Sequence, residues 1–372
     1  MIFVAVILIG LLLAYSNGAN DNFKGVATLL GSRTTSYRGA LLWAAATTAL
    51  GSVAAVVFAR QLLVAFSGKG LVPPTVVADP VFSGAVALAA ALTVLAATRL
   101  GFPISTTHAL IGGMVGAGVV LAPGGVSATK LSSGFILPLL MSPLIAVGLA
   151  ALLYPPLRFA RRRFGITKET CVCIGEEVVG VVPGAVSPGQ AVSALQLQSF
   201  AVVDKAKCQV HYRGGFMGIS AGPALDVAHY LTAGAVSFAR GLNDTPKIAA
   251  LLLVGQVVAP GAAIAGVAVF MAAGGVISAR RVAQTMSHRV TDMNAGQGFT
   301  ANLVTAFLVI VASRFGLPVS TTHVSCGSLF GIGAVTQQAH WGTIGRIALA
   351  WLITLPVAIV LGAACAALLA AV

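Results

Sequence analysis

Hydrophobic residues follow one another in long runs along this chain, and polar residues gather in the short stretches between them. The runs cover residues 1–16, 39–66, 80–98, 104–122, 134–157, 227–240, 248–275, 299–313, 317–335 and 345–371. A helix needs about 20 apolar residues to cross the hydrocarbon core of a bilayer. Several runs reach that length, and several are interrupted by glycine, proline or polar clusters. The pattern predicts a chain that crosses the membrane roughly ten times.

Composition agrees with this pattern. The chain has 372 residues, of which 58% are hydrophobic and only 8% are charged, whereas soluble domains carry about 25% charged residues. Irregular backbone is too costly in lipid, and the 43 glycines suit close helix packing. We therefore predict an all-α polytopic membrane protein of the cell (plasma) membrane, with roughly 10–12 membrane segments.

The charge is strongly positive, with 22 lysines and arginines against nine acidic residues, a net +13. In a soluble protein this excess would indicate nucleic-acid binding. Here many of the cations stand in short loops between apolar runs, as expected for loops on the cytoplasmic side. We therefore predict the lipid bilayer as a partner and no nucleic acid.

Residues 158–225 form the longest polar stretch. It opens with "RFARRRFGITK", which favours a cytoplasmic position. The following segments, "CVCIGEEVVGVV" and "LQLQSFAVVDKAKCQVHY", contain β-branched residues in partial alternation. They predict short strands in a small soluble insert. By contrast, "RRVAQTMSHRV" at 280–290 is basic and partly amphipathic, which favours an interfacial or connecting helix.

The cysteines form an odd set that predicts no disulfide framework: Cys171, Cys173, Cys208, Cys326 and Cys365. Three of them, with His211, offer four zinc ligands across the expected strands. Their spacing is not a familiar zinc pattern, and a cysteine is often simply a small buried hydrophobe. We predict no metal and no cofactor.

Two polar motifs occur twice, in the same order. "GANDNFKG" at residue 18 matches "GLNDTPKI" at residue 241, and "GFPISTTHALIGGMVGAG" at 101 matches "GLPVSTTHVSCGSLFGIG" at 316. The chain is therefore predicted to consist of two related transmembrane repeats, 1–157 and 226–372, joined by the insert 158–225. Duplicated halves with interrupted hydrophobic segments are typical of secondary transporters, which bind substrate near the midplane. The repeats alone leave open whether the halves are inverted or parallel.

The Pro-x-Ser-Thr-Thr-His motif suits the start of a helix. Proline fits the beginning of a helix, and serine or threonine fits its N-cap. Each copy therefore predicts a half-helix inside the membrane whose free N–H groups and hydroxyls face an anion. Two such ends would surround a tetrahedral oxyanion. The alternative is an ordinary capped helix start with no ligand.

The Asn-Asp-x-x-Lys motif places rare charges in apolar surroundings. Asp21 and Asp244 are matching members of a set of nine acids. A charge at the bilayer centre costs roughly 2.5–3.5 kcal/mol on insertion scales. The cost is tolerable where the carboxylate holds a cation such as Na⁺ at a helix break. The alternative is an Asp–Lys pair one helical turn apart.

His108 and His323 follow the two Thr-Thr pairs. A histidine in this position is a candidate proton carrier or an anion donor. Equally, it can simply hydrogen-bond a neighbouring helix.

In these four motifs the chain resembles the PiT family of inorganic phosphate transporters. The resemblance implies two inverted repeats with broken helices and re-entrant hairpins, phosphate uptake driven by Na⁺ or H⁺, and a homodimer. It also implies anion contacts from Ser105, Thr106, Thr107, Ser320, Thr321 and Thr322. By the same resemblance, the residues that bind the coupling cation and the substrate would include Asn20, Asp21, Asn243 and Asp244.

The chain departs from this family at two matching positions. The family motif usually continues Asn-Asp-Val-Ala-Asn, and here Lys24 and Lys247 replace its last residue, while Arg240 stands where the family often has histidine. Our hypothesis is that both lysines point into the substrate site and supply the charge that bound Na⁺ supplies in relatives. Transport would then be independent of Na⁺ and coupled to H⁺. The alternative is that each lysine snorkels to the interface or pairs with its own aspartate.

The sequence thus predicts a secondary transporter of inorganic phosphate that works by alternating access. A sulfate or other oxyanion permease is the first alternative, because a more cationic site suits sulfate. An anion channel is less favoured, since paired aspartates make sense mainly as cation ligands or proton sites. No nucleophile set indicates an enzyme, and no phosphate-binding loop motif indicates ATP-driven transport.

Overall fold

The structure is a computed structural model that describes residues 2–181, 194–212, 216–253 and 258–371. The predicted insert and the predicted run 248–275 therefore lie partly outside the described residues. The chain divides into two compact units, one made of Met1–Tyr154 with His229–Val372 and the other of Pro155–Ala228. The predicted division at 157 and 226 stays a prediction.

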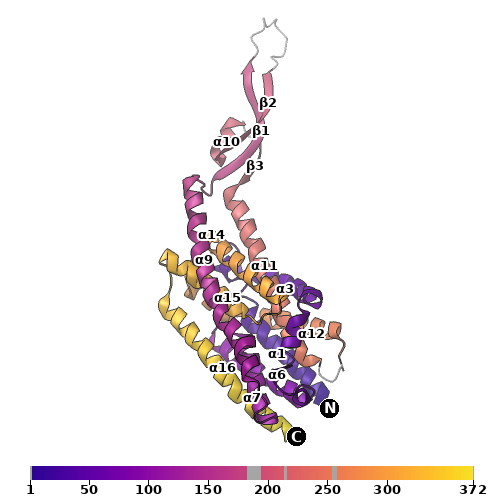
Figure 1. Cartoon of the computed structure of the whole chain (residues 1–372). Coiled ribbons are helices and arrows are strands. Elements are labelled where there is room, and N and C mark those ends of the chain that lie inside the picture. Colours follow the sequence, from indigo (N-terminus) through magenta and orange to yellow (C-terminus); the bar gives the residue numbers. More distant parts are fainter. Residues whose placement is uncertain (1, 182–193, 213–215, 254–257, 372) are drawn as a thin grey trace. The chain divides into compact units, whose positions relative to one another are not determined.

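Helices make up the larger unit (Figure 1). They are α1 (Ile2–Asp21), α2 (Ala27–Gly31), α3 (Tyr37–Phe58), α4 (Arg60–Ala65), α5 (Pro74–Val77), α6 (Pro80–Leu100), α7 (Thr106–Leu121), α8 (Ala128–Leu131), α9 (Leu137–Arg163), α11 (Ala221–Leu252), α12 (Pro260–Ser278), α13 (Arg280–Gln284), α14 (Ala295–Arg314), α15 (Thr321–Thr336) and α16 (Trp341–Ala370). Single π-helical turns, Ser132–Ile136 and Thr285–Arg289, precede α9 and follow α13. Helices α9 and α11 continue into the smaller unit.

Seven helices in the described part of the chain are long and apolar enough to cross a membrane. This confirms the helical membrane class. Helices α7 and α15 have 16 residues each, or about 24 Å of helix, which is shorter than the hydrocarbon core of about 30 Å. They are the half-helices that the repeated Ser-Thr-Thr-His motif predicts. The segment at 280–290 forms the short helix α13 and the π-helical turn after it, so it is helical as predicted and too short to cross a membrane.

The two halves of the larger unit contain corresponding helices in the same order. Helices α1, α3, α6, α7 and α9 of the first half are followed by α11, α12, α14, α15 and α16 of the second. The short helices α7 and α15 begin at matching residues of the repeated motif, Thr106 and Thr321. The duplicated motifs thus lie on corresponding elements.

The two Asn-Asp motifs differ in one respect. Helix α1 ends at Asp21, and a turn leads to α2. Helix α11, however, runs without interruption to Leu252 with Pro246 inside it. The expected helix break in the second half is therefore wrong. Pro246 removes only one backbone donor, and residues 239–252 are all buried, so tertiary packing outweighs the low helix propensity of proline.

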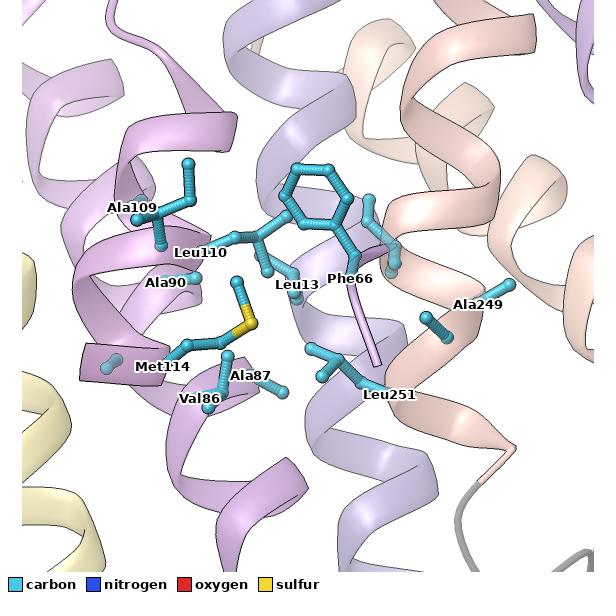
Figure 2. Close-up of a cluster of buried hydrophobic side chains, with 14 of the residues drawn as sticks. Leu13, Phe66, Val86, Ala87, Ala90, Ala109, Leu110, Met114, Ala249 and Leu251 are labelled. Carbon is cyan, nitrogen blue, oxygen red and sulfur yellow. The ribbon is translucent and has the colours of Figure 1, made fainter. Parts of the chain in front are cut away.

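Small residues bring the helices of the larger unit close together. A Cβ added at Gly18 of α1 would lie 1.9 Å from the carbonyl oxygen of Met271 in α12, and one at Gly116 of α7 would lie 2.0 Å from that of Ile359 in α16. Figure 2 shows the apolar cluster that holds α1, α6, α7 and α11 together, with Leu13 and Met114 among its buried members. The backbones that carry the polar motifs therefore have little room to shift independently.

A three-stranded antiparallel sheet forms the core of the smaller unit. Its order is β2 (Ala194–Asp204), β1 (Thr170–Val181), β3 (Phe216–Ser220), which confirms the predicted strands. Cys171 and Cys173 lie two residues apart on β1 and pack with Cys208 of α10 (Lys205–His211).

Two of these cysteines, Cys173 and Cys208, form a disulfide. The expectation that the cysteines form no disulfide framework is therefore wrong. Helix α10 follows β2 directly and brings Cys208 onto the sheet. The free thiol of Cys171 lies within 4.8 Å of both bonded sulfurs.

Candidate functional site

The repeated Pro-x-Ser-Thr-Thr-His motifs begin α7 and α15 as predicted. Ser105 is the N-cap of α7, and its hydroxyl accepts a 3.1 Å hydrogen bond from the backbone N–H of His108. Ser320 caps α15 in the same way, at 3.3 Å from the backbone nitrogen of His323. Both serines are buried. Each helix thus begins inside the protein with its remaining N–H groups at a buried polar position.

Lys24 is surrounded by oxygen atoms. Its Nζ donates to Asn20 Oδ1 at 2.8 Å, to the carbonyl of Ile104 at 2.8 Å and to Thr322 Oγ1 at 2.6 Å. It also forms an ion pair with Asp21. The partners are an amide, a carbonyl, a hydroxyl and a carboxylate, and the lysine is only 2% exposed.

Lys247 has a matching set of partners in the second half. Its Nζ donates to Thr107 Oγ1 and to the carbonyl of Val319, both at 2.8 Å. The carboxylate of Asp244 lies 3.5 Å away. Each lysine therefore pairs with the aspartate of its own half, and each also binds a threonine hydroxyl from the other half.

The same two threonines also form hydrogen bonds between the halves. Thr107 donates to the carbonyl of Val319 at 3.3 Å, and Thr322 donates to the carbonyl of Ile104 at 2.8 Å. Ile104 and Val319 occupy the same place in the two motifs, one residue before the capping serine. The start of α7 and the start of α15 therefore meet, and the two ammonium groups join them.

Asn17 links the two aspartates. Its Nδ2 lies 3.1 Å from Asp21 Oδ2, 3.1 Å from Thr106 Oγ1 and 3.3 Å from Asp244 Oδ2. Thr106 in turn donates to Asp21 Oδ2 at 3.3 Å. Thr321, the residue that matches Thr106, is buried at the start of α15. The carboxylates of both halves are thus joined through one amide.

Asn20 and Asn243 position the helices. Asn20 Nδ2 donates to Thr98 Oγ1 at 2.9 Å and to the carbonyl of Phe102 at 3.0 Å, which holds α1 against the end of α6. Asn243 accepts from Ser313 Oγ at 3.2 Å and donates to Asp244 Oδ1 at 2.9 Å. The amide nitrogen of Asn20 is therefore engaged by the protein itself, and its oxygen is a partner of Lys24.

The two histidines of the motifs lie side by side. The ring centroids of His108 and His323 are 4.6 Å apart, and Trp351 packs on His323 at 4.0 Å. They line an apolar cavity of about 290 Å³ between α7, α9, α15 and α16. A proton role for these histidines stays a prediction.

We call these residues the central polar cluster: Asn17, Asn20, Asp21, Lys24, Thr106, Thr107, Asn243, Asp244, Lys247 and Thr322, with the carbonyls of Ile104 and Val319. All ten side chains are buried. Our sequence prediction missed Asn17 and the two carbonyls. Asn17 stands one helical turn before the first Asn-Asp motif, and Arg240 stands at the matching place before the second. A search for polar residues at this shared spacing would have found Asn17, because its counterpart Arg240 already stands out as a departure from the family motif.

Comparison with known proteins agrees with the motifs. A model of the phosphate transporter family matches residues 17–362. A candidate phosphate permease of Thermococcus kodakarensis is 27% identical, over 96% of this chain and 95% of its own. A candidate low-affinity inorganic phosphate transporter of Mycobacterium tuberculosis is 27% identical, over 96% of this chain and 75% of its own.

A solved structure of a sodium-dependent phosphate transporter has the same fold. Its TM-score is 0.75 at 21% identity, over 100% of this chain and 99% of that chain. The matched proteins are transporters and not enzymes, in agreement with the prediction from the sequence.

Proposed function

This chain belongs to the phosphate transporter family, and from that premise we propose that it carries inorganic phosphate across the cell membrane by secondary active transport. The supporting observation is the meeting of two half-helix starts, α7 and α15, at the buried central polar cluster. Helix N-termini favour anions, because their N–H groups are unpaired and the helix dipole is positive there. The hydroxyls of both motifs add neutral donors for a tetrahedral oxyanion.

The arrangement of the lysines supports a way to bind and release this anion. Thr107 and Thr322 each accept from the lysine of the other half. When the anion enters, its oxygens replace these hydroxyls as partners of the ammonium groups, and the hydroxyls turn to donate to the anion. The cross-links between the halves then open. We infer that the halves are inverted repeats and rock past each other to expose the cluster alternately to the two sides of the membrane.

The ligands around Lys24 support transport without bound Na⁺, and we propose H⁺ as the coupling ion in its place. A carboxylate, an amide, a carbonyl and a hydroxyl oxygen are the groups that a hard cation prefers, and all four surround the Nζ atom. The Nζ atom of Lys247 likewise donates to a carboxylate, a carbonyl and a hydroxyl oxygen. The ammonium groups therefore take the place of two bound cations.

Uptake of labelled phosphate into proteoliposomes tests the function. We expect uptake that depends on a pH gradient, proceeds without Na⁺, and is inhibited by unlabelled phosphate and arsenate. The assay is run at two pH values with and without a Na⁺ gradient. Strict Na⁺ dependence would contradict the proposed coupling but leave phosphate transport intact. Absence of phosphate uptake under all conditions would contradict the function itself.

A sulfate permease is the second candidate. It is favoured by the helix starts and hydroxyls of α7 and α15, which suit any tetrahedral oxyanion and so suit sulfate as well as phosphate. Sulfate uptake that exceeds phosphate uptake in the same vesicles would support it. Electrical conductance without accumulation would instead indicate an anion channel.

Two further proposals concern assembly and orientation. We propose that the transporter is a homodimer, which light scattering of the detergent-solubilised protein would test.

We also propose that the insert 158–225 faces the cytoplasm, in keeping with its basic opening segment. Protease cleavage of the insert in intact cells would contradict this orientation.

A further inference from the structure

Arg240 lies on the face of α11 that carries the second Asn-Asp motif. Asp244 and Lys247 follow it by four and seven positions, so the three residues share one side of the helix. Asn17 is the matching residue of the first half, and it contacts both aspartates. Asp21 and Asp244 also lie close enough to Arg240 for a Coulomb attraction. Arg240 therefore stands at the edge of the central polar cluster.

The guanidinium of Arg240 has no partner of its own among the residues that the structure describes. The side chain is 1% exposed, and its Nε, Nη1 and Nη2 atoms are buried without a hydrogen bond. A guanidinium has five N–H donors, and a buried donor left unpaired is costly. Lys24 and Lys247, by contrast, have their oxygen partners in place. The donors of the Arg240 guanidinium are thus available to bind an anion.

The aspartates near Arg240 are already engaged by other groups. The oxygens of Asp21 bind Lys24, Asn17 and Thr106. Those of Asp244 bind Asn243, Lys247 and Asn17. Arg240 therefore lacks a hydrogen-bonded carboxylate, although two lie nearby.

The charge count of the buried groups leaves one positive charge. The buried Asp, Glu, Lys and Arg side chains of the described residues are Asp21, Asp244, Lys24, Lys247 and Arg240. The two aspartates balance the two lysines, and Arg240 remains. Because an unbalanced charge is expensive away from water, the site is best closed around a ligand with a single negative charge.

We propose that the Arg240 guanidinium binds two oxygens of the transported oxyanion and makes the site selective for a singly charged one, H₂PO₄⁻ in the case of phosphate. This inference rests on the proposed function. The planar fork of arginine matches two oxygens of a tetrahedral anion. Sulfate has the same shape, but it leaves the closed site with one excess negative charge, so it binds more weakly.

The test measures the thermal unfolding midpoint of the purified full-length chain while inorganic phosphate or sulfate is added, because a ligand that binds only the folded protein raises this midpoint. The test variant is Arg240→Gln, which removes the charge and keeps much of the side chain. Arg346→Gln is the matched control, because Arg346 is exposed on α16 and its side chain donates to Gly342 and Thr343 of the same helix.

We expect the wild type and Arg346→Gln to be stabilised by phosphate more than by sulfate. In Arg240→Gln, we expect phosphate affinity to fall roughly tenfold to hundredfold, because the charge-assisted hydrogen bonds of the guanidinium are lost. Its midpoint without anion should equal or exceed that of the wild type, since an unpaired buried cation is removed. A lower midpoint together with an unchanged response to phosphate would show a structural role and overturn the proposal.

Further outcomes separate this proposal from the proposed function. An undiminished phosphate response in Arg240→Gln overturns the role of Arg240 and leaves phosphate transport standing. A wild type that responds more strongly to sulfate overturns both the selectivity and the phosphate assignment. If Arg240→Gln does not fold, Arg240→Lys keeps the charge without the fork, and an unchanged phosphate affinity in that variant overturns the two-oxygen contact.

Discussion

Lys24 and Thr322 lie 298 positions apart in the sequence, yet the lysine Nζ donates a 2.6 Å hydrogen bond to the threonine Oγ1. The bond joins the turn after α1 to the start of α15, so it connects the two halves of the transporter. Lys247 and Thr107 form the corresponding bond at 2.8 Å. Two equivalent links therefore join the halves at the central polar cluster.

The first prediction concerns these hydroxyls. Replacing Thr107 or Thr322 by valine keeps the shape but removes both the lysine acceptor and a donor to phosphate. We expect each change to lower the kcat/KM of phosphate uptake by roughly tenfold to hundredfold, and the two variants to behave alike. The control is Thr336→Val on α15, whose hydroxyl donates to the carbonyl oxygens of Ile332 and Gly333 in its own helix. An undiminished uptake rate in either test variant would contradict the symmetric site.

The second prediction concerns the buried ion pairs. Asp21→Asn leaves the Lys24 ammonium buried without its counter-charge, which should destabilise the protein by about 3–5 kcal/mol and abolish uptake. Combining Asp21→Asn with Lys24→Met should restore most of the stability but not the uptake. Thermal unfolding and vesicle uptake measure the two effects. Asp292→Asn is the control, because its contact with His340 is exposed.

Asp244→Asn tests the same point in the second half. Its pair with Lys247 is longer, at 3.5 Å, so we expect a smaller loss of stability than for Asp21→Asn and an equal loss of uptake. Uptake that survives both aspartate substitutions would remove these residues from the site.

The third prediction separates helix capping from transport. Ser105→Ala and Ser320→Ala each remove an N-cap, which costs about 1 kcal/mol, and they disturb the helix starts that face the anion. We expect a weaker affinity for phosphate in both. Ser36→Ala also removes an N-cap, that of α3, but its hydrogen bond is exposed and lies outside the central polar cluster. It should cost similar stability and leave the KM for phosphate unchanged.

The fourth prediction concerns the coupling ion. Replacing Lys24 and Lys247 together by asparagine removes the two ammonium groups and leaves their carboxylate, carbonyl and hydroxyl partners behind. We expect phosphate uptake by this double variant to require Na⁺, whereas wild-type uptake does not. If both proteins show the same response to a Na⁺ gradient, the lysines do not replace bound cations.

The fifth prediction concerns the insert. The disulfide between Cys173 and Cys208 leaves Cys171, Cys326 and Cys365 as free thiols. Alkylation of the denatured, unreduced chain should therefore modify three cysteines, and five after reduction, as counted by intact mass. Five modified cysteines without reduction would contradict the disulfide. Because disulfides persist mainly in oxidising compartments, three modified cysteines would count against the proposed cytoplasmic position of the insert.

Local signals explain what the sequence could predict. The apolar runs indicate the membrane helices, and the Pro-x-Ser-Thr pattern predicts that α7 and α15 begin at a serine or threonine cap, which is the serine in both. The spacing of Asp21 and Lys24 also allowed for their pairing within one turn, which the sequence offered as the alternative and which the structure contains. Each of these features depends on residues that are close in the sequence.

Features that depend on tertiary packing could not be predicted in this way. The partner of Lys24 in the other half requires α7 and α15 to meet. Helix α11 continues through Pro246 because its neighbours bury it on all sides. The disulfide requires α10 to lie on β1 and bring Cys208 to Cys173. The low helix propensity of proline alone predicts a break in α11, and the cysteine spacing alone predicts no disulfide.

The two Asn-Asp-x-x-Lys motifs lie differently on their helices. Asp21 ends α1 and Lys24 lies in the turn that follows, whereas Asp244 and Lys247 both belong to the continuous α11. If the halves rock as proposed, we expect Lys24 to move apart from Asp21 and Lys247 to move together with Asp244. The two directions of transport are then unequal, and we expect phosphate release to be faster in one of them.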